Sequence, residues 1–387
     1  MDAQPLYDLA PVARLMLLGV VIALGPLAWV WLRNRHAPPA HRLRVLTLIT
    51  LFLTFDLVLF GAFTRLTDSG LGCPDWPGCY GSVSPVGAST SIAAAQEAMP
   101  HGPVTFSKAW IEMIHRYLAT AVGVLILVLS MVSWVERRRL SVSYVWPLVT
   151  LVWVCLQGAF GALTVTMKLF PAIVTLHLLG GLGLLALLRA QSVGYALAEP
   201  GHAGPVPLPG RLRWALGAVF VLLWLQIALG GWVSTNYAVL VCGEFPTCQG
   251  SWWPAMNFRE GFTLWRELGQ NHTGELITFP ALTAIHYVHR LMAYLVLAAM
   301  LWLGWRLWSV DGMRPAARAL LLLAAWQFAS GLTNVVLDWP LLAAVGHTGG
   351  AAALVIVLTG ALCGTRRASQ RDAASSATSL HLSTPIR

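Results

Sequence analysis

The chain has 387 residues, of which 57% are hydrophobic and only 11% are charged. Because soluble domains carry about a quarter charged residues, this composition predicts a membrane protein without a separate soluble enzyme domain. The formal net charge of +9 does not indicate nucleic-acid binding, since no basic patch interleaved with aromatic residues stands outside the apolar runs.

Nine apolar runs are long enough to cross a bilayer, which takes about 20 helical residues. The first, Leu15 to Leu32, differs from a cleaved signal peptide because it is too long and its basic residues follow it. The sequence therefore predicts an all-α polytopic fold. Its predicted spans are residues 13–32, 44–63, 109–134, 144–166, 171–190, 212–235, 279–307, 316–337 and 340–363.

Arginine placement predicts the orientation of these spans. Arginines gather in short connections on one side, whereas the opposite side carries only scattered cations. The positive-inside rule assigns the arginine-rich side to the cytoplasm. The N-terminus is then expected outside, together with two long loops, and the C-terminus inside. The cytoplasmic arginines are Arg33, Arg35, Arg42, Arg44, Arg137, Arg138, Arg139, Arg189, Arg211, Arg213, Arg306, Arg314, Arg318, Arg366, Arg367 and Arg371.

Each long outer loop contains a pair of cysteines with the same spacing. Cys73 and Cys79 bracket a Pro- and Gly-rich turn in "TRLTDSGLGCPDWPGCYG", and Cys242 and Cys248 recur in "VSTNYAVLVCGEFPTCQG". Outward-facing cysteines can form disulfides, although so short a loop adds modest stability. A redox role would require an exposed, activated thiolate, and the sequence leaves this alternative open.

The cysteine loops belong to an internal repeat that divides the chain near residue 205. Four further segments recur in the same order in both halves. Each half has four spans, so both copies enter the membrane in the same sense, as a parallel repeat. The matching segments are "LFGAFTRL" and "ALGGWVST", "IHRYLA" and "VHRLMA", "LQGAFGALT" and "WQFASGLTN", and "TLHLLGG" and "VGHTGGA".

Four of the eleven histidines lie within predicted spans: His115, His177, His289 and His347. Ionisable groups at membrane depth are rare and usually functional. One histidine stands on each of two helices per half, at similar depths in the outer half of the bilayer. Two facing imidazoles can bind a heme iron from both sides, and the glycines that follow the second histidine of each pair are expected to leave space for the macrocycle.

The alternative for each histidine is a core imidazole hydrogen-bonded to a neighbouring helix, which the duplication disfavours. Zinc would need a tighter cluster with further ligands. Arg116 and Arg290 follow the first histidine of each pair, and either bind heme propionates or extend to the interface.

The two halves differ three residues before the first histidine of each pair. Glu112 stands there in the first half and His286 in the second. A residue at i−3 shares the helix face, so Glu112 is expected near the pocket, where a carboxylate can act as an acid or base or stabilise a developing cation. The alternative for Glu112 is an ion pair with an arginine near the outer interface. Asp56 and His286 receive no assignment.

The cysteine motif, "EMIHR" at residues 112–116 and the duplicated histidines closely resemble the heme A synthase family over about residues 44–363. The resemblance implies two four-helix bundles and oxidation of the C8 methyl group of heme O to a formyl group, giving heme A for cytochrome c oxidase. It implies heme O at His115 and His177, heme b as a bis-histidine cofactor at His289 and His347, and Glu112 as the catalytic residue. The outer cysteines of the family match Cys73, Cys79, Cys242 and Cys248. The N-terminal span is additional to the eight of the family.

These observations give one expected organisation. Residues 1–43 hold the extra transmembrane helix and a cytoplasmic linker, 44–205 the heme O bundle, 206–365 the pseudo-symmetric heme b bundle, and 366–387 a disordered cytoplasmic tail. The expected place is a bacterial inner membrane, with periplasmic cysteine loops. Two successive hydroxylations, with water as the oxygen source, are the expected chemistry.

Two functions from other classes stay open: a diheme electron carrier that oxidises quinol, and a heme transporter or chaperone. Expected partners are heme O synthase and cytochrome oxidase assembly factors, besides an electron acceptor that the sequence does not identify. Association of several copies of the chain is also left open, and no nucleic acid is expected.

Overall fold

The computed structural model describes residues 10–202 and 204–368. In that part of the chain, nine helices are long and apolar enough to span a membrane. Each coincides with one predicted span to within five residues at either end, except that α6 continues seven residues beyond the predicted end. The all-α polytopic fold class is therefore confirmed. The nine helices are α1 (Ala10–Asn34), α2 (Pro39–Leu66), α4 (Phe106–Val135), α5 (Val145–Thr166), α6 (Pro171–Leu197), α7 (Gly210–Thr235), α9 (Phe279–Trp308), α10 (Arg314–Val336) and α11 (Leu341–Cys363).

Local sequence signals set the helix ends that position the histidines. Thr105 caps α4, because its side chain accepts a hydrogen bond from the Lys108 N–H at 3.3 Å. α6 begins at Pro171, whose fixed φ and missing N–H suit the first helical turn. The connection from α5 to α6 is tight, with Lys168 and Leu169 at positive φ. His177 therefore lies only two turns from the loop end of its helix.

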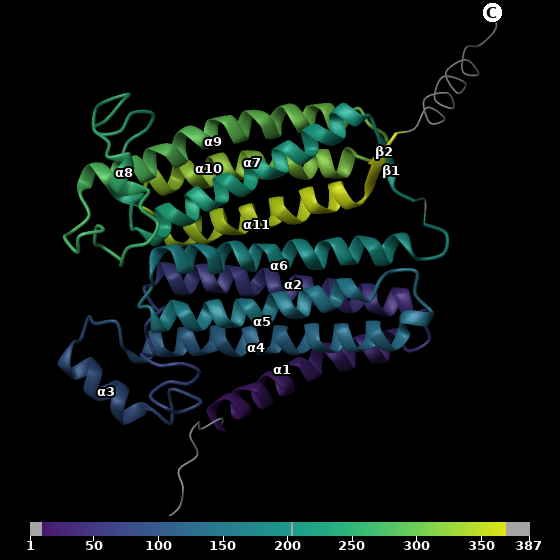
Figure 1. Cartoon of the computed structure of the whole chain (residues 1–387), viewed down its shortest axis with the longest axis horizontal. Helices are drawn as coiled ribbons and strands as arrows, with labels where there is room; N and C mark the ends of the chain where they lie inside the picture. The colour runs from purple at the N-terminus through teal and green to yellow at the C-terminus, as the bar shows by residue number, and fades with distance from the viewer. Residues whose placement is uncertain (1–9, 203, 369–387) are drawn as a thin grey trace, which may run out of the picture.

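The spanning helices pack as two groups that lie side by side (Figure 1). In the first group, α2 and α5 each contact both α4 and α6; in the second, α7 and α10 each contact both α9 and α11. The groups meet where α11 packs on α2 and α6, and where α6 packs on α7. α1 packs mainly on α4, where Gly19 leaves the space that the Thr120 methyl group occupies.

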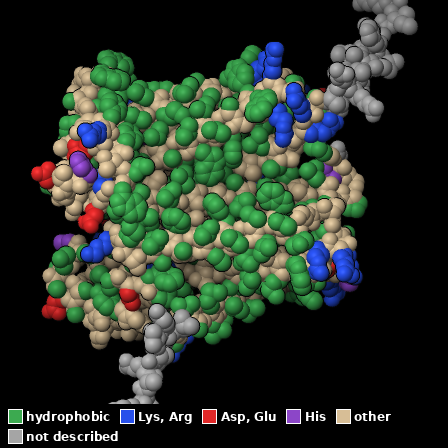
Figure 2. All heavy atoms as spheres, in the orientation of Figure 1, with side chains coloured by type: hydrophobic (Ala, Val, Ile, Leu, Met, Phe, Trp, Pro, Cys, Tyr) green, Lys and Arg blue, Asp and Glu red, His purple; other side chains and the backbone are tan. Residues whose placement is uncertain are grey.

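The two ends of the molecule differ in structure and charge. At one end lie the long loops, with the short helices α3 (Ser89–Ala98) and α8 (Phe258–Gly261) (Figure 1). At the other end the connections are short, and Figure 2 shows most Lys and Arg side chains gathered there. The surface between the ends is mainly hydrophobic, as expected for a surface that faces lipid.

A small sheet and two 3-10 helices complete the described structure. β1 (Val206–Leu208) pairs in parallel with β2 (Thr365–Arg367), and the 3-10 helices are Glu136–Arg138 and Val239–Val241. The tail boundary expected at residue 366 was therefore placed too early, because the first tail residues pair with β1. Residues 369–387 of the expected tail lie outside the described part of the chain.

A polar cluster joins the two groups at the loop end. The Arg65 guanidinium donates to the Ser234 carbonyl at 2.8 Å and lies 4.1 Å from the centre of the Tyr237 ring. The Tyr237 hydroxyl donates to Asp68 at 2.7 Å. Burial, the largest cause, raises the pKa of Tyr237 above its ordinary value. These contacts connect the loop that follows α2 with the loop that follows α7.

Candidate functional site

The four intramembrane histidines come from helices that are diagonal within each group. His115 lies on α4 and His177 on α6, while His289 lies on α9 and His347 on α11. His115 and His177 are close enough to interact electrostatically, and so are His289 and His347. Diagonal helices face each other across the interior of a bundle, where side chains from facing helices build cofactor sites.

A glycine on a neighbouring helix stands against each of these imidazoles. A Cβ atom added at any of the four glycines would lie within 2.9 to 3.4 Å of the imidazole Cε1 atom. A larger side chain would therefore push the ring away or prevent its approach. The pairs are Gly61 on α2 with His115, Gly161 on α5 with His177, Gly230 on α7 with His289, and Gly331 on α10 with His347.

Two of the glycines that follow the second histidines, Gly180 and Gly350, lie against a neighbouring helix. A Cβ atom at Gly180 would overlap the Gln157 amide, and one at Gly350 would lie 2.6 Å from Gln327 and Trp326. These glycines admit side chains of the adjacent helices. Close helix packing, which the sequence did not reveal, therefore requires glycine at these two positions.

In the second histidine pair, His347 has a hydrogen-bond acceptor at Nδ1, the ring atom that would face away from a metal. Ser330 Oγ lies 2.9 Å from His347 Nδ1 and itself donates to the Trp326 carbonyl at 2.7 Å. The serine oxygen is then the acceptor of an Nδ1–H, which leaves Nε2 with a free lone pair. A contact of this kind fixes the orientation of a ligating imidazole. The Gln226 amide nitrogen donates to the His289 carbonyl at 3.2 Å and lies 3.1 Å from Nδ1 of the same residue. Because an amide N–H can only donate, it offers no acceptor for an Nδ1–H of His289.

The first pair lacks these partners. The Nδ1 atoms of His115 and His177 are buried and have no hydrogen-bond partner among the described residues. In the repeat, Phe160 takes the place of Ser330 and offers no acceptor. Facing imidazoles in an apolar interior form the donor set of a bis-histidine heme, so both pairs could hold one, with more firmly oriented ligands in the second group.

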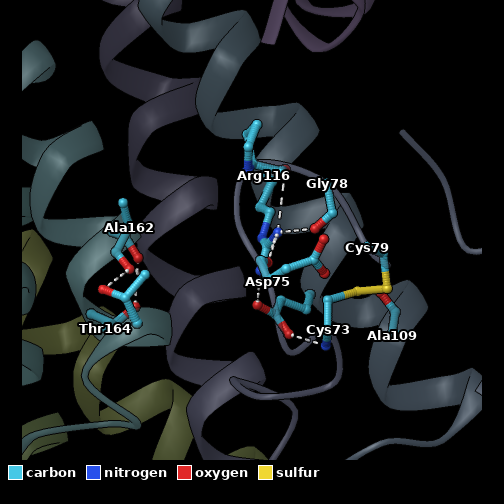
Figure 3. A network of polar contacts seen from close by, with 12 residues as sticks. Cys73, Asp75, Gly78, Cys79, Ala109, Arg116, Ala162 and Thr164 are labelled. Atoms are coloured by element: carbon cyan, nitrogen blue, oxygen red, sulfur yellow. Dashed lines mark hydrogen bonds and ion pairs between the residues drawn. A yellow bond between two sulfur atoms is a disulfide. The ribbon is translucent and has the colours of Figure 1, made fainter. Parts of the chain in front are cut away.

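Glu112 and Arg116 connect the first pocket helix to the first cysteine loop. Arg116 donates to Glu112 Oε1, and the Cys73 N–H donates to Oε2 at 2.8 Å. The same guanidinium donates to the carbonyls of Asp75 and Gly78 at 3.0 and 2.5 Å (Figure 3). Glu112 is only 4% exposed. The ion pair considered as an alternative for Glu112 is thus present, one turn from His115.

We call this arrangement, an arginine that binds loop carbonyls and a side chain one turn before it on the helix, the arginine clamp. The second group repeats the clamp with an imidazole in place of the carboxylate. Arg290 donates to the carbonyls of Thr247 and Cys242 at 2.8 and 3.2 Å. His286 Nδ1 lies 2.8 Å from the Ala238 carbonyl, and its Nε2 lies 3.4 Å from the Arg290 guanidinium. The sequence alone gave no partner for His286.

Both predicted disulfides are formed, Cys73–Cys79 and Cys242–Cys248. All four cysteines are fully buried, the first pair against the start of α4 and the second against α9. Arg116 and Arg290 are buried as well, at 8% and 7% exposure, so neither extends to the interface. This role of the arginines was not predicted from the sequence, because every residue has a backbone carbonyl and the sequence does not indicate which carbonyls an arginine will bind.

Other residues singled out from the sequence lie apart from this site. Asp56 is exposed on α2, and Cys155 and Cys363 are free thiols within spans. The sequence alone assigns no role to Ser330. The available signal was that the repeat places a polar Ser330 where the first half has Phe160.

Comparisons with known proteins agree with this architecture. Residues 44–359 match the family of cytochrome oxidase assembly proteins. A heme A synthase of Shewanella oneidensis is 37% identical over 80% of this chain and 92% of its own length. Heme A synthases of Methylobacterium nodulans (32% identity; 76% of this chain, 84% of the relative) and Halalkalibacterium halodurans (23%; 84% and 96%) are also similar. The chain therefore belongs to the cytochrome oxidase assembly protein family, together with these heme A synthases.

Proposed function

We propose that this protein is a heme A synthase that oxidises the C8 methyl group of heme O to a formyl group. His115 and His177 bind heme O as the substrate, and His289 and His347 bind heme b as a resident cofactor. The observation that carries this assignment is the difference between the pairs: in the second, Ser330 is the acceptor for His347 Nδ1, and in the first both Nδ1 atoms are unpartnered.

This difference suits the two kinds of ligand. A resident cofactor benefits from imidazoles that hydrogen bonds hold in one tautomer and orientation. A substrate must enter and leave, so weaker orientation of its ligands favours exchange. When bound, heme b supplies reversible one-electron redox chemistry near the substrate bundle.

Glu112 is the proposed catalytic residue. Both of its carboxylate oxygens accept hydrogen bonds, from Arg116 and from the Cys73 N–H, as an anion requires. Conversion of a methyl group and one water to a formyl group releases four electrons and four protons, in two hydroxylations followed by loss of water. The electrons pass to a separate electron acceptor, an expected partner of this protein. A fixed carboxylate stabilises positive charge that develops at the methyl carbon, and can accept protons from the attacking water.

We also infer the orientation and the symmetry. The arginine-rich end lies in the cytoplasm and the disulfide loops in the periplasm of a bacterial inner membrane. The two groups of four helices are pseudo-symmetric copies. Arg116 binds the carbonyls of Pro77 and Gly78, and Arg290 binds those of Pro246 and Thr247, which are equivalent positions in the repeat.

The test compares Glu112→Gln and Glu112→His with the wild type. The second variant copies the side chain that already faces an arginine in the other half, so it preserves a polar partner for Arg116. We expect both variants to keep heme b and to accumulate heme O, identified by extraction and chromatography of the hemes. Thermal unfolding of each variant reports separately on the clamp.

Two results would contradict the proposal. A normal yield of heme A in both variants would remove Glu112 from the chemistry. Heme b alone in the wild-type protein, with rapid quinol oxidation, would favour the electron carrier instead.

A further inference from the structure

A second polar pocket lies at the arginine-rich end, between the two groups of helices. It has a volume of about 280 Å³, and its walls come from α2, α6, α11 and the connection that leads into β1. Arg44, Arg189, Ser192 and His202 supply its polar lining. None of the described lining residues is acidic. The histidine pairs and the disulfide loops take no part in it.

Arg189 is the deepest charged residue of this pocket. It lies eight residues before the end of α6, about 12 Å along the helix axis. Its Nη1 donates to Ser192 Oγ at 3.3 Å, but its Nε is buried without a partner among the described residues. A guanidinium has five N–H donors, and leaving them unsatisfied in an apolar region is costly. Arg189 is therefore a strong anion ligand that this chain does not satisfy.

The backbone of α11 is shaped to admit this guanidinium. A Cβ atom at Gly360 would lie 2.7 Å from both Nε and Nη2 of Arg189. A larger residue at this position would displace the guanidinium from the helix of the opposite group. Arg189 therefore lies at the junction of the two groups, where it lines the pocket.

A second cation adds to the positive potential. Arg44 lies within electrostatic range of Arg189, and like charges repel. Arg44 is partly compensated, because its guanidinium pairs with Glu199 at 3.0 Å. No ion pair compensates Arg189 in the described part of the chain. Two arginines that converge at a helix junction form a typical site for a bidentate anion such as a phosphate.

The remaining wall indicates where that phosphate comes from. Leu48, Val193, Leu197 and Val206 line the pocket beside the arginines. A free phosphate would lose its hydration next to these apolar side chains, whereas a lipid would place its glycerol and acyl carbons there. Basic pockets between transmembrane helices at the cytoplasmic side bind the head groups of anionic lipids.

We propose that this pocket binds the phosphate of an anionic phospholipid, with Arg189 and Arg44 as its ligands. The bound lipid bridges α6 of the first group and α11 of the second. It therefore stabilises the junction between the two groups of helices.

The experiment uses the full-length protein, purified in a neutral detergent and delipidated. Dioctanoyl phosphatidylglycerol, dioctanoyl phosphatidylcholine or inorganic phosphate is added, and bound ligand is measured by native mass spectrometry and by the thermal unfolding midpoint. We expect phosphatidylglycerol to bind and to raise the midpoint as its concentration increases. The other two ligands should bind at least about tenfold more weakly.

Variants assign the binding to this pocket. Arg189→Gln should weaken phosphatidylglycerol binding by about tenfold or more, because it removes a charge-assisted contact. The matched control is Arg138→Gln, which removes an exposed arginine at the same end of the molecule and should bind as the wild type does. If Arg189→Gln does not fold, Arg189→Lys keeps the charge but loses the planar fork, and should also bind more weakly.

Three outcomes would overturn the proposal. Equal binding of phosphatidylcholine would show that the anionic head group is not recognised. Equal binding of inorganic phosphate would assign the site to a free anion. Unchanged phosphatidylglycerol affinity in both Arg189 variants would place the lipid elsewhere.

Discussion

Ser330→Ala tests whether a hydrogen bond to the second histidine pair holds the proposed cofactor. The Ser330 hydroxyl donates to the Trp326 carbonyl at 2.7 Å and thereby accepts from His347 Nδ1 at 2.9 Å. Alanine would leave the Nδ1–H buried without an acceptor. It would also free the imidazole to rotate about its side-chain bonds.

The size of the effect follows from this one contact. Loss of a hydrogen bond behind a ligating histidine costs about 10- to 100-fold in affinity, or about 1.4 to 2.8 kcal/mol. The imidazole also becomes a weaker electron donor when its Nδ1–H has no acceptor. The midpoint potential of heme b should therefore rise, since the ferric state loses more stabilisation than the ferrous state.

Heme b content, measured while an apo-heme-binding protein competes for heme, gives the affinity, and a redox titration gives the potential. Thr333→Ala is the matched control, because this hydroxyl on the same helix bonds only the Ala329 carbonyl, at 2.8 Å. If Ser330→Ala matches Thr333→Ala in both measurements, the contact does not support a heme ligand, and the reasoning about resident and exchangeable hemes fails.

Three further perturbations separate structural from functional roles. Replacing Cys73 and Cys79 by serine should lower the free energy of unfolding by about 2 kcal/mol. Heme A formation should persist, because Arg116 still binds the loop carbonyls. Complete loss of activity in a folded variant would instead indicate electron transfer by the cysteines. Gly230→Ala should reduce heme b content, because its Cβ atom would lie 2.9 Å from the His289 imidazole. The control is Gly217→Ala on the same helix, which should leave heme b content unchanged because a Cβ atom there would meet nothing within 4 Å. Tyr237 has a raised pKa in the folded protein. Its contribution to stability is therefore present below the unfolded pKa of about 10 and is lost at higher pH. The unfolding midpoint of Tyr237→Phe should fall less than that of the wild type above about pH 10, and an equal fall would contradict this.

The helical fold was predictable because hydropathy and arginine placement are one-dimensional signals. Each span is a long apolar run, and bilayer thickness fixes its length. The pairing of helices was less accessible. That α4 and α6 are diagonal, and that α11 packs between α2 and α6, follows from side-chain fit at many positions. The strand at residues 365–367 was missed because three residues carry no periodicity.

The candidate site was predictable where it depends on rare residues at membrane depth. The four histidines and Glu112 are conspicuous in apolar helices, so sequence reasoning selected them. Backbone acceptors and glycines are not conspicuous. The clamp of Arg116 on loop carbonyls, and the approach of Gly61 to His115, depend on coordinates that no residue type specifies.

The difference between Glu112 and His286 concerns charge as well as catalysis. His286 Nδ1 donates to the Ala238 carbonyl, and its Nε2 faces a guanidinium that can only donate. The second contact requires an unprotonated Nε2, so the imidazole is neutral. The Arg290 clamp thus keeps a positive charge, whereas Glu112 cancels that of Arg116.

This charge bears on the proposed direction of electron flow. His286 lies within electrostatic range of His289, so a positive clamp there stabilises an electron on heme b and favours its reduction. His286→Glu would copy the first half and cancel the charge. We expect a lower midpoint potential of heme b in this variant, with His286→Gln, which keeps the side chain neutral, near the wild-type value. Equal potentials in the glutamate and glutamine variants would mean that the clamp charge does not reach the heme, and the second half would then need another reason for its histidine.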